Sequence, residues 1–181
     1  MKKTQIVLSA IVITVTLGLI GLNTIISKEI EASNDQVTSP VIIAQGNSKN
    51  TNTIFYQEKG IAIKGTDPVA YFMEGKPVEG DKNFSYQWGN AMWWFKNEQN
   101  RDLFAQNPEK YAPQYGGFCA WAISQNYTAT IDPNAWKIVE GKLYLNYDKR
   151  IQSRWEQDIP GHITRANRNW RDILADLQKK Q

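Results

Sequence analysis

Twelve residues near the middle of the chain decide the fold, and they read Tyr111-Ala112-Pro113-Gln114-Tyr115-Gly116-Gly117-Phe118-Cys119-Ala120-Trp121-Ala122. The Gly116-Gly117 pair allows a sharp turn and a close approach of another backbone segment. Aromatic residues flank this pair, and Cys119 is the only cysteine of the 181 residues. We expect the stretch to be a hinge between a helix that precedes it and a β-hairpin that follows it.

The single cysteine and the many aromatic residues limit the ways in which the chain can be stabilised. One cysteine forms no disulfide within the chain. In an oxidising compartment such a thiol is buried, reactive or paired with another molecule. Seven Trp, eight Tyr and six Phe compensate for the missing disulfides, because each of these side chains buries a large area.

The residues before the central stretch carry local signals for short strands and helices. Phe84, Tyr86 and Trp88 alternate with polar residues, which is the period of a half-buried strand. The expected strands cover residues 54–56 and 61–63, and residues 84–88 are expected to form a hairpin with 91–95. The first expected helix covers residues 69–73, capped by Asp67 and ended by Gly75. A second helix, capped by Asn97, is expected to run to about residue 107, followed by a short turn from Pro108 to Tyr111.

A second hairpin and a helical region are expected after the central stretch. Glu140-Gly141 lies between apolar runs at 136–139 and 143–147, which is a strong signal for a tight hairpin. Asp148 can cap the last helical region, and Pro160-Gly161 is expected to break it in two. Residues 127–131 form a possible strand, followed by a possible helix start at Asp132-Pro133. The whole pattern predicts a small α+β domain.

The N-terminal part has the composition of a targeting segment. Lys2 and Lys3 precede an apolar run from Ile6 to Ile26. An export signal has this form, and about 20 apolar residues also suffice to span a bilayer. Residues 1–30 are therefore expected to be a signal peptide or a transmembrane anchor, with a slight preference for the anchor. Residues 31–52 are expected to be a flexible polar linker, and residues 53–181 the globular domain.

This organisation predicts an extracytoplasmic protein, periplasmic or at the cell surface, that is membrane-anchored or secreted. The membrane would be a partner through the N-terminal segment if that segment is not cleaved, and Lys2 and Lys3 suit a cytoplasmic N-terminus. Without these two lysines the chain has 19 basic and 18 acidic residues and no block of like charge. Nucleic acid is therefore not an expected partner.

Four stretches within residues 64–118 carry a family resemblance: Gly65-Thr66-Asp67-Pro68-Val69-Ala70-Tyr71-Phe72, Tyr86-Gln87-Trp88, the run from Trp93 to Phe104 (Trp-Trp-Phe-Lys-Asn-Glu-Gln-Asn-Arg-Asp-Leu-Phe) and Asn107-Pro108-Glu109-Lys110-Tyr111. On these residues, the segment resembles the YHS domain, a small treble-clef-like module. Tyr115-Gly116-Gly117-Phe118-Cys119-Ala120 and the hairpin from Ala135 to Tyr147 extend the similarity to exported bacterial YHS-domain proteins, over about residues 61–170. The resemblance implies an antiparallel β/helix domain with an added β-hairpin and C-terminal helices.

The chain departs from the metal-associated members of that family. Those modules carry three cysteines, at positions that Ala70, Lys96 and Asn100 occupy here. None of these residues supplies a thiolate, so the metal site that the family implies is absent. Cys119 lies beyond the motif and does not replace those ligands in sequence.

Five residues are the candidates for ligand binding: Cys119, Asp67, Tyr71, Tyr115 and His162. Cys119 is a small buried hydrophobe, a contact to a metal or ligand, or a redox or nucleophilic thiol. Cys119 and His162 are also weak candidates for a Cu(I) site, because that ion accepts two soft or imidazole ligands. Aromatic residues either line a ligand cleft or fill the core; they are Tyr71, Trp88, Trp93, Trp94, Tyr115, Trp121 and Trp136.

The sequence favours a binding or accessory function over catalysis. It has no phosphate loop, no Gly-x-Ser-x-Gly and no His-Glu-x-x-His pattern. We therefore expect a non-catalytic extracytoplasmic YHS-like module that binds a small ligand or a protein. The alternative is copper binding or thiol chemistry through Cys119 with His162. The sequence identifies neither a cofactor nor a particular partner.

Overall fold

A computed structural model of the protein describes residues 44–45 and 53–181. The expected signal or anchor at residues 1–30 lies outside the described residues, and so does the expected linker at 31–52 apart from residues 44–45. None of the helices in the described part is long and apolar enough to cross a membrane.

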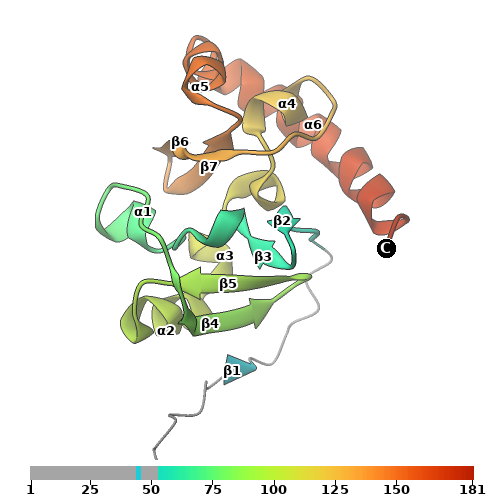
Figure 1. Cartoon of the computed structure of the whole chain (residues 1–181). Helices are drawn as coiled ribbons and strands as arrows, with labels where there is room; N and C mark the ends of the chain where they lie inside the picture. Colours follow the sequence, from blue (N-terminus) through green and yellow to red (C-terminus); the bar gives the residue numbers. More distant parts are fainter. Residues whose placement is uncertain (1–43, 46–52) are drawn as a thin grey trace, which may run out of the picture. The chain divides into compact units, whose positions relative to one another are not determined.

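The described residues form an α+β fold, as the sequence predicts (Figure 1). The strands are β1 (Ala44–Gln45), β2 (Gln57–Glu58), β3 (Ile61–Ala62), β4 (Asp81–Trp88), β5 (Ala91–Phe95), β6 (Asp132–Val139) and β7 (Lys142–Asn146). The helices are α1 (Ala70–Met73), α2 (Glu98–Gln106), α3 (Pro108–Tyr111), α4 (Ala120–Ser124), α5 (Lys149–Glu156) and α6 (Ile159–Gln178), with 3₁₀ turns at Ile63–Gly65 and Gln114–Gly117.

Five strands form one mixed sheet, in the order β1-β4-β5-β3-β2. The predicted pair, β4 with β5, is antiparallel, and so is β2 with β3. The pairs that join distant segments, β1 with β4 and β3 with β5, are parallel, so the sheet is not purely antiparallel. The two-residue strand β1 comes from the segment expected to be linker.

The β4–β5 hairpin and helix α2 enclose an aromatic core centred on Phe104. The predicted hairpin and the Asn97 cap are both confirmed, and Asn97 Oδ1 accepts a hydrogen bond from the N–H of Asn100. The fully buried Phe104 ring lies 5.0 Å from the ring of Trp93, centroid to centroid. It also contacts Tyr86, Trp88 and Phe95. Such ring pairs add to the area that burial removes from water, and they fix α2 on the sheet.

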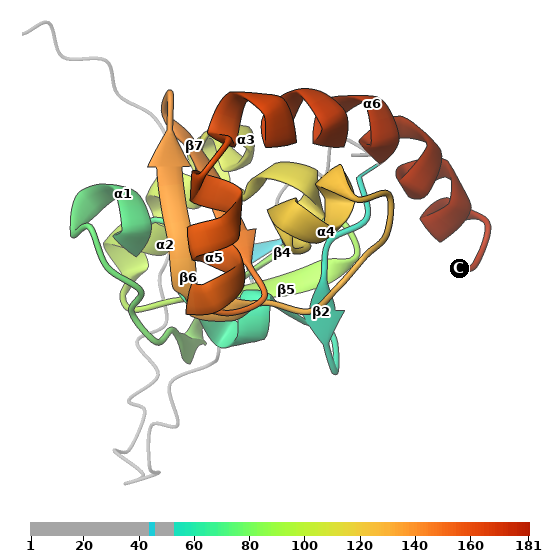
Figure 2. The same cartoon turned by 90° about the horizontal axis from the view of Figure 1, so that it is seen from above.

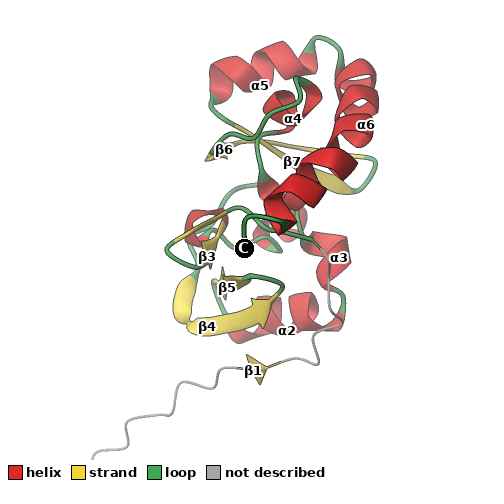
Figure 3. Ribbon diagram, turned by 90° about the vertical axis from the view of Figure 1, so that its right-hand side faces the viewer, coloured by secondary structure: helices red, strands yellow, loops and turns green. Residues whose placement is uncertain are grey.

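The second part of the fold comprises β6, β7, α4, α5 and α6, which gather on the other side of the central stretch (Figures 1 and 3). The expected β6–β7 hairpin is confirmed, with Glu140 and Gly141 in the left-handed region at its turn. Asp148 caps α5 as predicted. The helical region breaks at residues 157–158, and Pro160 lies in the first turn of α6, where its missing N–H costs no hydrogen bond. Helix α4 packs against α6, α5 and β7 (Figure 2).

Three local predictions were wrong. Residues 127–131 are not a strand, and Asp132-Pro133 begins β6 rather than a helix. Asp132 accepts a hydrogen bond from the Asn134 N–H in a local turn, and the pairing of β6 with β7 shifts register there, so tertiary pairing overrides the cap signal. Residues 54–56 belong to no strand, and the strand follows at β2. Helix α4 was missed.

The Gly116-Gly117 turn brings two distant backbone segments together, as the sequence suggests. Tyr115, Gly116 and Gly117 all have positive φ. The carbonyl of Gly116 accepts a hydrogen bond from the N–H of Tyr56 at 2.8 Å. A Cβ atom on Gly116 would lie 2.1 Å from the carbonyl oxygen of Ile54, so only glycine fits.

Candidate functional site

A cleft of about 260 Å³ opens beside the first turn of α4, on the side of the start of α5. Its lining comes from α4, from the loop that follows α4, and from the junction of β7 with α5. The lining residues are Cys119, Trp121, Ala122, Tyr127, Ala129, Tyr147, Arg150 and Ile151. The cleft therefore brings together the central stretch and the residues that follow the second hairpin.

Cys119 lies at the buried side of this cleft, where backbone and side-chain hydrogen bonds hold it. Its backbone N–H donates to the carbonyl of Ala129 at 3.2 Å, and its carbonyl accepts from Ile123 in the first turn of α4. Its side chain is fully buried, and the thiol donates to Oδ1 of the buried Asn146 at 3.9 Å. The same oxygen accepts from the N–H of Trp121 at 3.2 Å, so Asn146 ties β7 to the start of α4.

The electrostatic surroundings of Cys119 favour the neutral thiol. Burial raises the pKa of this thiol above its usual value, and the nearby backbone N–H groups of Ala122, Tyr147 and Trp121 offset only part of that effect. The sulfur is therefore protonated at neutral pH. A protonated thiol is a weak nucleophile, so the site lacks the low-pKa cysteine that thiol chemistry needs.

The open side of the cleft is aromatic and carries one charged side chain. Tyr127 and Tyr147 are 47% and 48% exposed, and Tyr127 packs edge-on against Trp121 with a centroid separation of 6.3 Å. Arg150 is the only charged residue of the lining. Its guanidinium lies 3.8 Å from Oδ2 of Asp148, which is a long and solvent-exposed ion pair.

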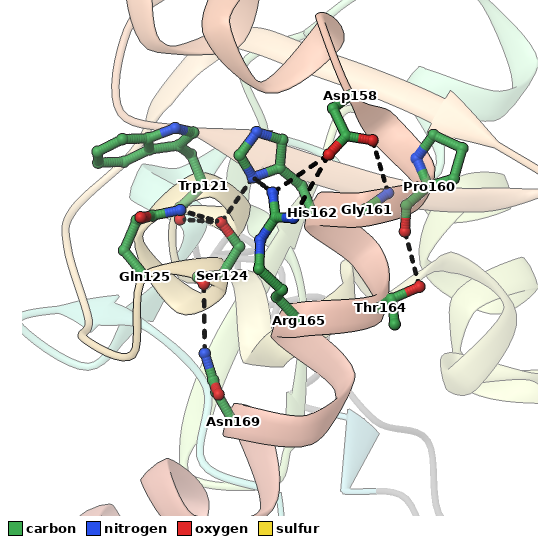
Figure 4. Close-up of polar contacts among 10 residues, drawn as sticks. All are labelled: Trp121, Ser124, Gln125, Asp158, Pro160, Gly161, His162, Thr164, Arg165 and Asn169. Atoms are coloured by element: carbon green, nitrogen blue, oxygen red, sulfur yellow. Dashed lines mark hydrogen bonds and ion pairs between the residues drawn. The ribbon is translucent and has the colours of Figure 1, made fainter.

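His162 lies in a separate polar cluster where α6 meets α4 (Figure 4). Its Nδ1 is 2.8 Å from Oγ of Ser124 and 3.0 Å from Nη2 of Arg165. Asp158, which caps α6, forms an ion pair with Arg165 at 3.4 Å. Because a guanidinium only donates hydrogen bonds, we assign Nδ1 as an acceptor and place the ring proton on Nε2.

This cluster is not arranged as a serine–histidine catalytic pair. The Ser124 hydroxyl is 2.6 Å from the carbonyl of Trp121, which competes for its proton. Burial and the charge of Arg165 lower the pKa of His162, with Asp158 acting in the opposite direction. A general base must accept a proton readily near neutral pH, and Arg165 opposes that step.

The same contacts predict a dependence of stability on pH. His162 is the only histidine in the chain. Its pKa is lower in the folded than in the unfolded protein, where it is about 6.5. The unfolded chain therefore binds more protons as the pH falls below about 6.5, and the free energy of unfolding should decrease from there down to the folded pKa.

Urea unfolding at pH 7.5, 6.5, 5.5 and 5.0 measures this decrease. The groups that face His162 are Arg165 and Asp158 from α6 and the uncharged Ser124 from α4. Because the depressed pKa of His162 is the cause of the decrease, His162→Gln should remove it. An equal loss of stability in the wild type and in this variant would contradict the assignment.

Asp67 is a structural carboxylate with four hydrogen-bond donors. It is fully buried. Oδ1 accepts from the N–H groups of Val69 and Ala70 at 2.8 and 3.3 Å, which is the predicted cap of the turn before α1. Oδ2 accepts from the N–H of Lys96 at 3.0 Å and from Nδ2 of Asn100 at 2.7 Å. Asp67 therefore joins the segment before α1 to the end of β5 and to α2.

Tyr71 and Tyr115 connect the two parts of the fold. The Tyr71 hydroxyl donates to the carbonyl of Pro133 at 2.8 Å, and its ring packs edge-on against Trp136. The Tyr115 hydroxyl donates to Oδ1 of Asn167 at 2.9 Å. Burial raises the pKa of both phenols above the ordinary value, so both remain protonated donors.

The five predicted site residues do not form one cluster of shared contacts. Within the described residues, Cys119, Asp67, Tyr71, Tyr115 and His162 have no hydrogen-bond partner in common. Of these five, Cys119 alone lines the cleft, together with Trp121 from the wider set of aromatic candidates.

Sequence reasoning missed Tyr127, Tyr147 and Arg150. Tyr147 and Arg150 lie on either side of the Asp148 cap. The sequence marks them only as an aromatic residue and an arginine near a predicted helix start. Tyr127 lies in a segment that was predicted to be a strand, so its position at the open side of the cleft had no sequence signal.

The described part of the chain contains no group of three or more His, Cys, Asp or Glu side chains placed to hold a metal ion. The contacts of Cys119 and His162 also have no residue in common.

Comparison with known proteins found no family model that matches the chain, no similar curated protein and no similar solved structure.

Proposed function

We propose that this protein is an extracytoplasmic YHS-like module that binds a small organic ligand in the Cys119 cleft without chemical turnover. The observation that carries the proposal is the cleft itself. It combines an apolar and aromatic lining with a single arginine, which is the usual composition of a small-molecule site. Export and membrane attachment belong to the proposal and rest on the sequence of residues 1–30.

The contacts of Asp67 support the YHS-like assignment. The three positions that carry cysteine in metal-associated members of that family are occupied by Ala70, Lys96 and Asn100. All three donate to the carboxylate of Asp67, two through backbone N–H groups and one through a side-chain amide. Residues far apart in sequence thus converge on one point, as a shared metal site would require. A hydrogen-bonded carboxylate takes the place of the thiolates.

Two observations support a non-catalytic role over thiol chemistry or copper binding. The Cys119 thiol is buried and has a raised pKa, so it is a poor nucleophile. The Nδ1 lone pair of His162 accepts a hydrogen bond from the Arg165 guanidinium. His162 is therefore poorly placed to act as the base or the second ligand that either alternative needs.

The mass of the protein purified from its own host tests this proposal. The full-length chain, kept in mild detergent, is weighed by mass spectrometry under native and under denaturing conditions. We expect the native mass to exceed the denatured mass by that of one small organic molecule. Equal masses would contradict ligand binding. An excess mass that survives denaturation would show a covalent adduct and would favour thiol chemistry at Cys119.

A further inference from the structure

The size of the Cys119 cleft limits what it can hold. Its volume is about 260 Å³, below the range of roughly 300–1,000 Å³ for sites that bind drug-sized molecules. A ligand with one or two rings fits this space. A folded peptide segment or a dinucleotide does not.

The aromatic lining indicates a planar apolar body for that ligand. Tyr127 and Tyr147 are two of only three large hydrophobic side chains that are strongly exposed in the described part of the chain. Both lie at the cleft, beside Trp121. Exposed aromatic side chains that gather at one concave site are a mark of ligand binding, and they favour an aromatic partner through offset or edge-on ring packing.

Arg150 indicates the charge of the ligand. Its side chain makes no hydrogen bond to any residue that the structure describes, and its ion pair with Asp148 is long. The side chain of Arg150 is 65% exposed. Oδ1 of Asp148 already accepts a hydrogen bond from the N–H of Ile151. Lys149 adds a second positive charge at the start of α5. The Arg150 guanidinium therefore keeps N–H donors that can bind a carboxylate through two parallel hydrogen bonds.

We propose that the Cys119 cleft binds a small aromatic monocarboxylate, with its carboxylate on Arg150 and its ring among Trp121, Tyr127 and Tyr147. This inference rests on the proposed function and adds the chemical class of the ligand. No bond is made or broken, so Cys119 contributes only the buried wall on which the apolar part of the ligand rests.

Two isosteric probes test the ligand class: indole-3-acetate, which is an anion, and indole-3-acetamide, which is neutral. Isothermal titration of the full-length protein in mild detergent measures both affinities. We expect the anion to bind about tenfold more tightly than the amide, because hydrogen bonds to a charged group are about twice as strong as neutral ones. Arg150→Gln should remove this preference. Lys149→Gln, which removes a neighbouring charge outside the lining, should retain it.

The outcomes separate this inference from the proposed function. Equal affinities for the two probes in the wild type, or a preference that persists in Arg150→Gln, would overturn the assignment of Arg150 while leaving a cleft that binds ligands. Failure of both probes to bind would overturn the aromatic class. In that case the mass measurement on host-purified protein still decides independently whether a ligand is present. Arg150 is exposed, so its variant is expected to keep the wild-type Tm.

Discussion

Gly116→Ala should leave little or no folded protein. The added methyl group would lie 2.1 Å from the carbonyl oxygen of Ile54, and the backbone there has a φ of +61°. Relief of the contact requires residues 54–56 to move away, which breaks the hydrogen bond from the Tyr56 N–H to the Gly116 carbonyl. We expect a loss of at least about 4 kcal/mol, a large part of the stability of a typical domain. Soluble yield and thermal unfolding followed by circular dichroism measure it.

Gly141→Ala is the matched control for this prediction. Gly141 also has a positive φ, of +71°, but no atom lies within 4 Å of the place that its Cβ would occupy. This substitution should therefore cost only the left-handed backbone penalty, about 1 kcal/mol. If the two variants lost similar stability, the close approach at Gly116 would not be what holds the central stretch in place.

Asp67→Asn should destabilise the protein strongly although it preserves the size of the side chain. An amide group can replace only one of the two carboxylate oxygens. Its NH₂ would face either the N–H groups of Val69 and Ala70 or the donors of Lys96 and Asn100. Each buried donor left without an acceptor costs about 1–3 kcal/mol, so we expect a loss of roughly 3 kcal/mol. The midpoint of urea unfolding measures the change.

Asp132→Asn provides the comparison, because Asp132 also precedes a proline. Oδ1 of Asp132 accepts only from the backbone and side chain of Asn134, close to the surface. An asparagine at this position can keep those contacts, and the expected loss is below about 0.5 kcal/mol. Equal losses at both positions would mean that Asp67 acts only as a local cap and does not join α1 to α2.

The sequence predicted the elements whose signals are local. The β4–β5 and β6–β7 hairpins follow from alternating residues on either side of a turn, and the caps at Asn97 and Asp148 follow from single side chains. Each of these signals acts over a few residues, where the chain has few alternatives. The Gly116-Gly117 turn was predicted for the same reason.

The errors arose where distant pairing decides the structure. Asp67-Pro68 and Asp132-Pro133 carry the same local signal, yet the first precedes a helix and the second begins a strand. The difference comes from β7, which pairs with residues 132–139. Helix α4 is short, and its position depends on contacts with α6 and β7 rather than on its own sequence.

The candidate site was predictable only in part, for a related reason. Cys119 and Trp121 lie in the central stretch and were both singled out. Tyr127, Tyr147 and Arg150 reach the same cleft from a loop and from the start of α5. Their proximity depends on the docking of the β6–β7 hairpin against α4, which no local pattern specifies. His162 was selected as a possible partner of Cys119, whereas its contacts are with Ser124 and Arg165.

The most direct test of the central claim compares the masses of two tryptophan variants purified from the host. Ala129 lines the cleft and Thr128 does not, although the two residues are adjacent in one loop. Native mass spectrometry should show that Ala129→Trp, which fills the cleft, has lost the small molecule, whereas Thr128→Trp retains it at the wild-type level. A ligand that remains on both variants would contradict the assignment of the Cys119 cleft as the binding site.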